Sequence, residues 1–539
     1  MRRLFGLLAI TAALCPAADL YPVAGTIINA AANTPLPHAW VRFLRQGASR
    51  DVVKAVTGTD GRFAFQLPAG SFLMLAGTRQ SWESYGSRTP ANALGSAVIV
   101  GPGKDTSAIV FRFFPPSVIT GRVLDEAGEP APQALVQLIG STVRNGRRSA
   151  SVLGWRRTGD LGEYRFDRLA AGVSYYLAVT GEPWYASRGL AVGATESETQ
   201  AAYRPVYYPD ADDPAKAAPI TPTPGEEVHA DFRLTLTSNA TVNLHYSPPP
   251  GLQGTATLYS DGIAGTSGVQ QVLQVSAPAY RQINPDGSVP FTTLSFRSVP
   301  PGHYTLRLTG IAAGQGYDSS VLVLVNGSDV SAEMDLKHVS RIEGNFQLPP
   351  GVVPKAPVTI AIRGAISGAV ASVRVHDDGT FVFPNVQAGH FTIFTGSGYF
   401  VTGLDAAGGA IKDGLLQIPD ETTAHVTVSL SSETGIVRGI VAEGGRPLEG
   451  ATVVLMGVAG QTLEFGSEDH DTGYQTESDG SFVFGAVPPG KYRIIAIENP
   501  DLEYRTPQVL APYLPAMREI EVKAHAAIDL QLPMIAAPH

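Results

Sequence analysis

The sequence predicts an all-β protein, a tandem array of five antiparallel β-sandwich domains. Five times along the chain, a turn with Asp and Gly leads into a strand of alternating residues. A small turn rich in Pro, Ala or Gly then leads into a further strand. A repeat at this spacing decides the architecture, because each copy is one structural unit. The repeated turns carry Asp60, Asp160, Asp286, Asp378 and Asp479.

The composition also predicts many short strands. Charged residues make up 16% of the 539 residues, below the roughly 25% of an average soluble protein, and 58 Gly and 41 Pro favour turns. The net charge of −9 leaves no basic stripe for phosphates, so we expect no nucleic-acid partner. Outside the N-terminus, the longest apolar run, at 320–325, is far shorter than the roughly 20 residues that a membrane-spanning helix needs.

Each unit is expected to open with a short strand centred on Gly. Alternation of core and solvent residues predicts the strand, and the Gly allows a neighbouring backbone to approach or the strand to bend. The pattern is present at residues 23–27, 119–123, 341–345 and 437–441.

A second strand follows a polar turn with Pro, at residues 39–43, 134–138, 356–360 and 451–455. Period two places Ala39, Val41 and Phe43 on one face, which we expect to be the core, and Trp40 on the other. In the other copies, Leu135, Pro357 and Thr452 take the place of Trp40.

The Asp/Gly turn between alternating strands is a strong hairpin signal, because Gly supplies a positive φ without steric cost. An Asx turn closed by the local backbone explains the repeated Asp without any ligand. Each unit closes with another alternating strand, such as residues 109–113 or 528–532.

These strands divide the chain into five units of ~100 residues with about seven short strands each, as in small sandwich domains. Unit 2 carries an insertion at 182–227, and unit 3 is divergent. Connectors such as Phe114-Pro115-Pro116 are stiff, and five domains of roughly 35 Å in a row would reach about 170 Å. The units cover residues 19–115 (unit 1), 116–236 (unit 2), 237–338 (unit 3), 339–432 (unit 4) and 433–539 (unit 5).

Residues 1–18 are expected to be a signal peptide, with Arg2-Arg3, an apolar stretch and small residues before a cleavage site at Ala17 or Ala18. The protein is therefore expected to be exported, to the periplasm, the cell surface or the medium. A lipid anchor at Cys15 is the alternative, which the preceding Leu14 disfavours. Because Cys15 is the single cysteine, the mature chain forms no internal disulfide and no thiolate metal site.

Three patterns together resemble the carboxypeptidase regulatory-like domain. They are Gly-x-Val in the opening strand, Pro-x-x-x-Ala-x-Val in the second, and Asp-x-x-Gly-x-Phe-x-Phe leading into Pro-x-Gly-x-Tyr. The resemblance is strong in units 1, 2, 4 and 5 and loose in unit 3. It implies a transthyretin-like or Ig-like sandwich, similar also to the B-type repeats of collagen adhesins and to starch-binding-like folds. It further implies a secreted, non-catalytic, multidomain bacterial protein.

Catalytic motifs are missing from the sequence. None of the eleven His residues begins a His-Glu-x-x-His string, and there is no Gly-x-Ser-x-Gly elbow, P-loop or dinucleotide fingerprint. We therefore expect neither an enzyme nor a cofactor.

Two kinds of loop residue are candidates for binding. Glu468, Asp469 and Asp471 are weak calcium candidates, because hard cations take carboxylate oxygens; a solvated acidic loop is the alternative, as the EF-hand spacing is missing. Aromatic residues in the longer loops either stack on a sugar or pack within and between domains. These ligand candidates are Trp82, Tyr85, Trp184, Tyr185, Tyr207 and Tyr208.

Three functions fit these features. The first is a non-catalytic structural and interaction protein of the cell envelope, an adhesin or spacer whose partner is a glycan or an envelope protein. The second is a carbohydrate-binding protein that uses the loop aromatics. The third is an accessory module of a peptidase or another envelope enzyme.

Overall fold

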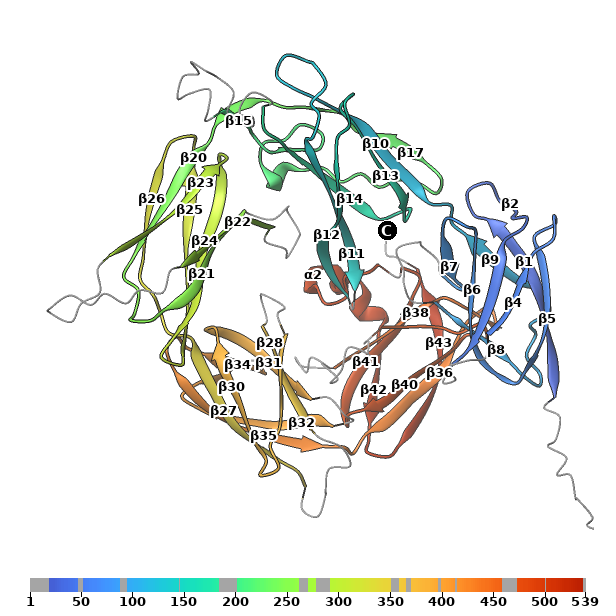
Figure 1. Cartoon of the computed structure of the whole chain (residues 1–539). Helices are drawn as coiled ribbons and strands as arrows, with labels where there is room; N and C mark the ends of the chain where they lie inside the picture. The colour runs from blue at the N-terminus through green and yellow to red at the C-terminus, as the bar shows by residue number, and fades with distance from the viewer. Residues whose placement is uncertain are drawn as a thin grey trace, which may run out of the picture.

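The computed structural model of the chain is shown in Figure 1. The structure describes residues 19–46, 52–87, 95–144, 146–183, 201–260, 270–277, 291–349, 358–364, 370–395, 399–412, 414–457, 473–499 and 501–536. The predicted signal peptide and Cys15 lie outside these residues. The regular secondary structure of the described residues is nearly all β-strand, as the sequence predicts.

Five hydrophobic cores follow one another along the chain, and each lies within one of the five predicted units. They span residues 23–113, 119–234, 240–334, 342–430 and 437–532. Ala39, Val41 and Phe43 are fully buried, which confirms the predicted core face of the second strand in unit 1.

Units 1 and 2 each place two main sheets around their core. In unit 1 the sheets are β2-β1-β5 with β9 beside β1, and β4-β3-β6-β7 with β8 beside β6. In unit 2 they are β13-β10-β17 with β18 beside β10, and β12-β11-β14-β16, while β15 pairs with β19. The elements are β1 (Leu20–Asn29), β2 (Thr34–Pro35), β3 (Trp40–Arg45), β4 (Val52–Val56), β5 (Arg62–Pro68), β6 (Gly70–Gly77), β7 (Trp82–Ser84), β8 (Ala97–Val100), β9 (Ile109–Phe113), β10 (Ser117–Leu124), β11 (Leu135–Arg144), β12 (Arg147–Arg157), β13 (Glu163–Leu169), β14 (Ser174–Thr180), β15 (Ala201–Tyr203), β16 (Val206–Tyr207), the 3₁₀ turn η1 (Pro214–Lys216), β17 (Glu227–His229), β18 (Phe232–Arg233) and β19 (Leu236–Ser238).

Units 3 and 4 repeat the same two-sheet plan. Unit 3 pairs β23-β20-β26 and β22-β21-β24-β25, and unit 4 pairs β30-β27-β35-β32 and β29-β28-β31-β34-β33. Their strands are β20 (Ala240–Tyr246), β21 (Gln253–Ser260), β22 (Gln270–Ala277), β23 (Thr292–Val299), β24 (Gly302–Ala312), β25 (Gln315–Val325), β26 (Val330–Met334), β27 (Ser340–Gln347), β28 (Thr359–Gly364), β29 (Val370–Arg374), β30 (Thr380–Val386), β31 (Gly389–Thr395), β32 (Phe400–Ala407), β33 (Ala410–Lys412), β34 (Leu415–Ile418) and β35 (Thr423–Ser431).

In unit 5 the two layers merge into one sheet, β37-β36-β43-β41-β38-β39, with β40 beside β36 and β42 beside β41. A short helical segment, which the sequence pattern did not predict, lies between β41 and β42. Its Leu510 and Tyr513 bury the outer face of β38 and β41. The elements are β36 (Gly435–Glu443), β37 (Arg446–Pro447), β38 (Thr452–Gly457), β39 (Gly473–Gln475), β40 (Ser481–Val487), β41 (Gly490–Ile497), α2 (Pro507–Leu510), the 3₁₀ turn η2 (Ala511–Ala516), β42 (Arg518–Val522) and β43 (Ala527–Ile535).

The opening strand of each unit lies between the aromatic strand and the closing strand. It pairs antiparallel with the aromatic strand and parallel with the closing strand, for example β1 with β5 and β9. The same arrangement recurs in units 2 to 5. The alternating pattern predicted these strands but carried no signal for the parallel pair.

The glycine of the opening strand sits where two neighbours come close. It is paired across the sheet with the first aromatic residue of the next strand: Gly25 with Phe63, Gly121 with Tyr164, Gly344 with Phe381 and Gly439 with Phe482. A Cβ atom on Gly121 would lie 1.9 Å from the carbonyl oxygen of Ala230. The expected close approach at this Gly is therefore confirmed. In unit 3, Leu244 takes the place of the glycine and Leu294 takes the place of the aromatic residue.

In units 1, 2, 4 and 5 the Asp/Gly turns do not form hairpins, and that prediction is wrong. Asp286 of unit 3 lies outside the described residues. In unit 1 the turn joins β4, which pairs with β3, to β5, which pairs with β1, so the chain crosses from one sheet to the other. The local chemistry is as predicted. Gly61 has φ of +69°, and the Asp60 carboxylate accepts a hydrogen bond from the backbone N–H of Arg62 at 3.1 Å.

A buried threonine before three of these turns is a feature that the sequence reading missed. The Thr158 hydroxyl donates to the carbonyl of Ala131 at 2.5 Å and accepts from the N–H of Ala134 at 2.9 Å. Thr57 and Thr476 make equivalent bonds in units 1 and 5. The hydroxyl thus fixes the turn that leads into the second strand.

Replacing Gly121 by Ala should strongly destabilise unit 2, because the new methyl group clashes with a backbone carbonyl. We expect a loss of ~2 kcal/mol or more in the free energy of unfolding, measured by urea denaturation of the full chain. Gly154→Ala is the matched control, because nothing lies within 4 Å of a Cβ atom there. Equal stability of the two variants would contradict the packing argument.

Replacing Thr158 by Val should leave the buried N–H of Ala134 and C=O of Ala131 without this partner. We expect a loss of ~1–3 kcal/mol, observed as a lower melting temperature by circular dichroism. Thr158→Ser keeps the hydroxyl and should lose much less. A Val variant as stable as the Ser variant would show that the hydroxyl does not matter.

Candidate functional site: the interface between units 1 and 5

The predicted aromatic ligand candidates do not share one environment. Tyr85 and Tyr207 are only 4% and 8% exposed, whereas Trp82 is 60% exposed. Tyr208 is half-buried against the unit 2 core and packs edge-on against Phe232. Trp82 and Tyr85 therefore do not form a joint platform. Trp184 and Tyr185 lie outside the described residues.

The calcium candidates Glu468, Asp469 and Asp471 also lie outside the described residues. Within the residues that the structure describes, no group of three or more His, Cys, Asp or Glu side chains could hold a metal ion. In the acidic stretch of unit 2, Asp212 pairs with Arg204 at 2.9 Å, and Asp213 caps the short turn η1.

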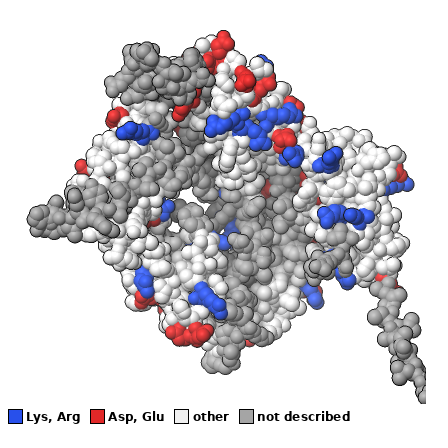
Figure 2. All heavy atoms as spheres, viewed as in Figure 1, with Lys and Arg blue, Asp and Glu red and all other residues white. Residues whose placement is uncertain are grey.

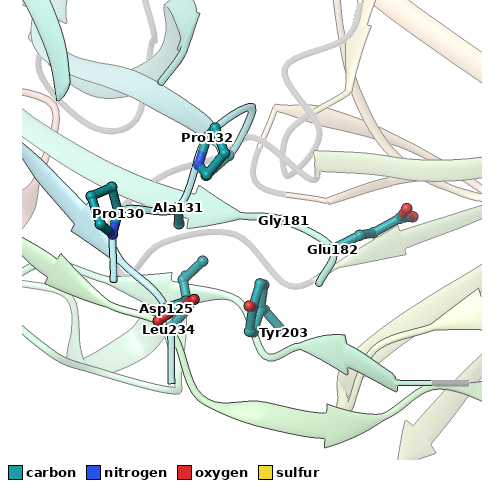
Figure 3. A pocket seen from close by; sticks show the side chains of 9 residues that line it. Asp125, Pro130, Ala131, Pro132, Gly181, Glu182, Tyr203 and Leu234 are labelled. Carbon is teal, nitrogen blue, oxygen red and sulfur yellow. The ribbon is translucent and has the colours of Figure 1, made fainter. Parts of the chain in front are cut away.

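A small cavity lies at one end of the unit 2 sandwich, under the Pro130-Ala131-Pro132 turn (Figure 3). Its volume is about 30 Å³, which is the space of roughly one water molecule. Tyr203 lines it and donates a hydrogen bond to the Glu126 carboxylate at 2.6 Å, while the Glu182 side chain points away from the other labelled residues. The cavity is too small for an organic ligand.

The richest set of polar contacts between distant parts of the sequence joins unit 1 to unit 5, and we call it the docking interface. Strand β8 of unit 1 meets the turn between β39 and β40 of unit 5. The N–H of Ser478 donates to the carbonyl of Ala97 at 3.0 Å, and the N–H of Ile99 donates to the Ser478 hydroxyl at 2.9 Å. The N–H of Ala97 donates to the Glu477 carboxylate. Unit 5 thereby supplies hydrogen-bond partners for the backbone groups at the edge of β8.

Side chains extend the docking interface on both sides of β8. The Ser96 hydroxyl donates to the carbonyl of Thr476 at 2.6 Å, and the Gln475 amide donates to the carbonyl of Gly86 at 2.5 Å. The Tyr85 hydroxyl donates to the Glu449 carboxylate. Lys104 and Asp479 form an ion pair at 2.5 Å. These contacts link residues more than 360 positions apart in the sequence.

The centre of the docking interface is polar and closed to solvent. Ser96 and Thr476 are 0% exposed, and Gln475 is buried with them. Buried polar groups cost free energy unless they are paired, and these groups pair with one another across the interface. The match of donors and acceptors, rather than apolar area, therefore specifies how unit 1 sits on unit 5.

Burial sets the electrostatics of this interface. Burial raises the pKa of Glu477, although hydrogen bonds from Tyr474 and from the Ala97 N–H act in the opposite direction. Burial, followed by the charge of Glu449, raises the pKa of Tyr85. Burial alone would raise the pKa of Asp479, but hydrogen bonds from Lys104 and Ser481 outweigh it and lower that pKa. The pKa of Glu477, at the centre of the interface, is therefore raised, whereas the pKa of Asp479, at the rim, is lowered.

A second contact joins unit 2 to unit 5. The tip of the β11–β12 hairpin reaches the segment before α2, where Arg148 pairs with Glu503 at 2.8 Å and the Arg505 N–H donates to the Gly146 carbonyl at 3.2 Å. Gly146 lies against the Tyr504 ring, 2.5 Å from the place of a Cβ atom, so no larger residue fits there.

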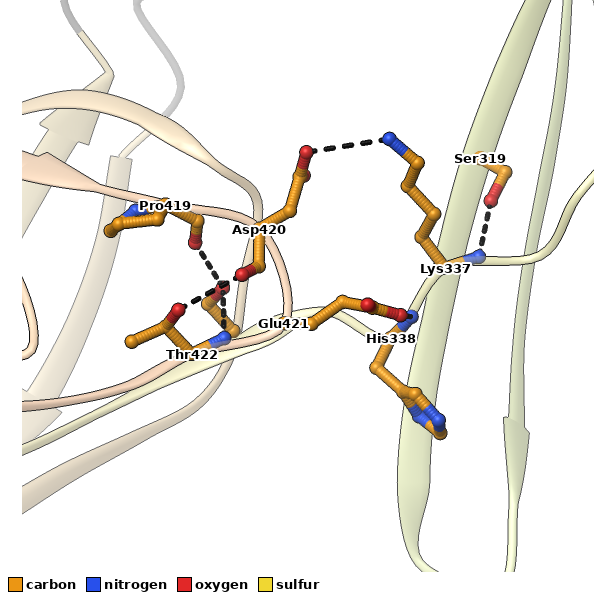
Figure 4. A network of polar contacts seen from close by, with 8 residues as sticks. Ser319, Lys337, His338, Pro419, Asp420, Glu421 and Thr422 are labelled. Atoms are coloured by element: carbon orange, nitrogen blue, oxygen red, sulfur yellow. Dashed lines mark hydrogen bonds and ion pairs between the residues drawn. The ribbon is translucent and has the colours of Figure 1, made fainter.

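The joint between units 3 and 4 is also held by polar contacts, as Figure 4 shows. Lys337 reaches Asp420 at 3.4 Å, and the N–H of His338 donates to the Glu421 carboxylate at 3.2 Å. The His338 ring packs against Tyr317, with 4.5 Å between the ring centres. The connector between these units is therefore held by contacts with both of them.

Together these contacts give the chain a ring-like course. Figure 1 shows units 2 to 5 following one another around a central region, with unit 1 (blue) lying against unit 5 (red). A row of five units, which would be about 170 Å long, is not what the structure shows, because the first and last units touch. The sequence of a connector restricts its angles but does not reveal the direction of each bend.

On the face shown in Figure 2, Lys and Arg side chains and Asp and Glu side chains are scattered, and much of the described surface is uncharged. Several of the basic side chains are paired, such as Arg122 with Glu163 and Arg165 with Glu227 in unit 2. No helix in the described residues is long and apolar enough to cross a membrane.

Comparisons with known proteins give similar solved structures only. No protein-family model and no curated protein matches the chain. The Bacillus anthracis TIE protein is 11% identical over 78% of this chain and 75% of that chain, with a TM-score of 0.16. A streptococcal ancillary pilin is 11% identical over 55% of this chain and 99% of that chain, with a TM-score of 0.20. GBS52, the minor pilin of Streptococcus agalactiae, is 14% identical over 40% of this chain and 95% of that chain, with a TM-score of 0.22.

These TM-scores are far below 0.5, so the fold assignment rests on the sheets and cores described above.

Opening the docking interface should expose the edge of β8. Ser96→Arg places a long charged side chain in a fully buried position, so the amide hydrogens of Ala97 and Ile99 should exchange faster with solvent. Hydrogen exchange measured by mass spectrometry checks this result. Ala64→Arg, on the exposed face of β5, is the control and should leave β8 protected. Unchanged protection in the Ser96 variant would contradict the docking.

Stability should also depend on Glu83 in β7, whose pKa burial raises from 4.5 to about 7. Between those values the folded state keeps a proton that the unfolded chain has released, so stability falls as the pH rises from 4.5 to about 7 and then levels off. Glu83→Gln should make the dependence shallower, as measured by urea denaturation between about pH 5 and pH 8. Parallel curves for the two proteins would show that Glu83 is not the cause.

Proposed function

We propose that this chain is a non-catalytic, exported structural and interaction protein of the cell envelope. The docking interface carries this proposal: the most extensive buried polar constellation that we describe holds two units together and pairs its groups internally. A catalytic site needs polar groups that face an open cleft and are free to meet a substrate. In the docking interface the polar groups are instead buried and bonded to one another, so they hold units 1 and 5 in their arrangement.

The remaining sequence-based expectations support this role. The repeat motifs resemble carboxypeptidase regulatory-like domains, residues 1–18 have the pattern of an export signal, and the five units follow boundaries at residues 115, 236, 338 and 432. Sandwich domains in series present loops on a rigid scaffold, which suits contacts with other envelope components. An adhesin or spacer of this kind acts through contacts between protein surfaces and does not catalyse a reaction.

Export is tested by producing the chain with and without residues 1–18 in a Gram-negative host. We expect the full chain in the periplasm, with a mature N-terminus at Ala18 or Asp19 by Edman sequencing. The shortened chain should stay in the cytoplasm. A full chain that is retained uncleaved in the cytoplasm would contradict the envelope role.

The absence of catalysis is tested on purified residues 19–539. Peptide, ester and glycoside substrates are offered with and without added Zn²⁺ and Ca²⁺, and we expect no turnover above the buffer rate. Turnover that copurifies with the protein through several columns and is lost on heating would overturn the proposal.

Carbohydrate binding is the second candidate, and one observation favours it. The indole of Trp82 is mostly exposed on a strand at the edge of a rigid sheet, where a flat ring can stack on a sugar. A glycan array compares the parent protein with Trp82→Ala and with Trp155→Ala, an equally exposed Trp in unit 2. Binding lost only in the Trp82 variant supports this candidate, and no binding to any glycan rejects it.

A further inference from the structure

We propose that unit 1 also binds unit 5 of a second copy of this chain through the docking interface, so that copies join head to tail by exchanging unit 1. The inference rests on the proposed structural function and names one partner for it. Five observations support this exchange.

The first observation is that the docking interface is heterologous. Strand β8 with Tyr85 and Ser96 forms one half, and Gln475 with the Glu477–Asp479 turn forms the other. Every copy of the chain therefore carries both halves, and each half fits the other half of any copy. An interface of this kind closes on itself or links molecules in series.

The second observation is that, among the described turns of units 1, 2, 4 and 5, only the turn of unit 5 has a carboxylate that can receive β8. Glu477 and Ser478 follow the buried Thr476 and bond to the backbone of Ala97 and Ile99. At the position of Glu477, unit 1 has Gly58, unit 2 has Gly159 and unit 4 has His376, and none of these supplies a carboxylate. Unit 1 is therefore specific for unit 5, which fixes a head-to-tail direction.

The third observation is that unit 1 is separable from the rest. It has its own core, and three residues, Phe114-Pro115-Pro116, connect β9 to β10. Unit 2 holds unit 5 independently through Arg148 and Glu503. Unit 1 can thus separate from its own unit 5 while units 2 to 5 keep their arrangement.

The fourth observation is the short, proline-stiffened connector. A short connector between two folded units is a known route to domain exchange. The Gly225 N–H donates to the Pro115 carbonyl at 3.0 Å and anchors the connector on unit 2.

The fifth observation concerns the energetic balance. Exchange replaces each docking contact by the same contact with another copy, so no hydrogen bond is lost. The intramolecular form is favoured by the effective concentration of unit 1 near its own unit 5. Linkage is therefore expected where copies are crowded, or where the intramolecular interface is removed by mutation.

The test uses two variants that each lack one half of the interface. Ser96→Arg blocks the unit 1 half, and Gln475→Arg blocks the unit 5 half. Each variant alone should be monomeric, because neither chain can pair with its own kind. Mixed at equal, roughly 200 µM concentrations, unit 1 of the Gln475 variant should dock on unit 5 of the Ser96 variant. Light scattering after size exclusion should then give twice the monomer mass.

Two controls accompany the mixture. The Ser96 variant mixed with a chain that carries both substitutions should stay monomeric, because no intact unit 1 half is present. The melting temperatures of all variants should lie close to that of the parent chain, which shows that the units remain folded. A mixture of folded variants that stays monomeric overturns the proposal.

A second pair of variants covers the case in which an Arg substitution prevents folding. Lys104→Glu and Asp479→Lys each place like charges across the rim ion pair. In a mixture, the acidic side chain introduced at position 104 of one chain faces the basic side chain introduced at position 479 of the other. The second interface between the same two chains keeps the parent pair, Lys104 with Asp479.

Dimer in the mixture and monomer in each pure variant support exchange, and equal amounts of dimer in all three samples reject it. Export and lack of turnover are unaffected by these outcomes, so the proposed function is tested separately.

Discussion

Units 1, 2, 4 and 5 depend on close packing around the glycine of the opening strand, whereas unit 3 has Leu244 at this position. This strand lies between the aromatic strand and the closing strand, and a side chain at the glycine would overlap with the backbone or ring on either side. Once the aromatic ring lies over the glycine, the opening and closing strands pair in parallel and the two sheets close on the core. In these four units the repeat is therefore a repeat of this one contact.

The contacts between units follow a different rule. Inside the units, apolar residues such as Phe43 and Leu67 fill the cores, whereas buried hydroxyls, amides and carboxylates hold unit 1 on unit 5. Apolar packing is nondirectional, so it stabilises a core without specifying a partner, while paired polar groups accept only a matching surface. The polar docking interface therefore fixes how unit 1 sits on unit 5. The same matching surface on a second copy of the chain accepts unit 1 in the same way.

The sequence predicted the all-β class, the core face of the second strand and the close approach at the opening glycine, because these follow from local alternation and from the size of one residue. The parallel pairing and the crossing between sheets could not be predicted, since they depend on which strands meet in space. Likewise, Tyr85 had the sequence of a loop aromatic, but its ring packs in the unit 1 core beside Phe111 and its hydroxyl reaches Glu449 of unit 5. The variation at Glu477 within the repeated turn was the one available signal for the docking interface.

The central claim is that the first and last units touch, and small-angle X-ray scattering of residues 19–539 in dilute solution tests it most directly. Five units of roughly 35 Å in an extended row would give a maximum dimension of about 170 Å. The docked arrangement predicts a clearly smaller maximum dimension and a scattering curve that fits the structure in Figure 1. A maximum dimension close to that of the extended row would contradict the account.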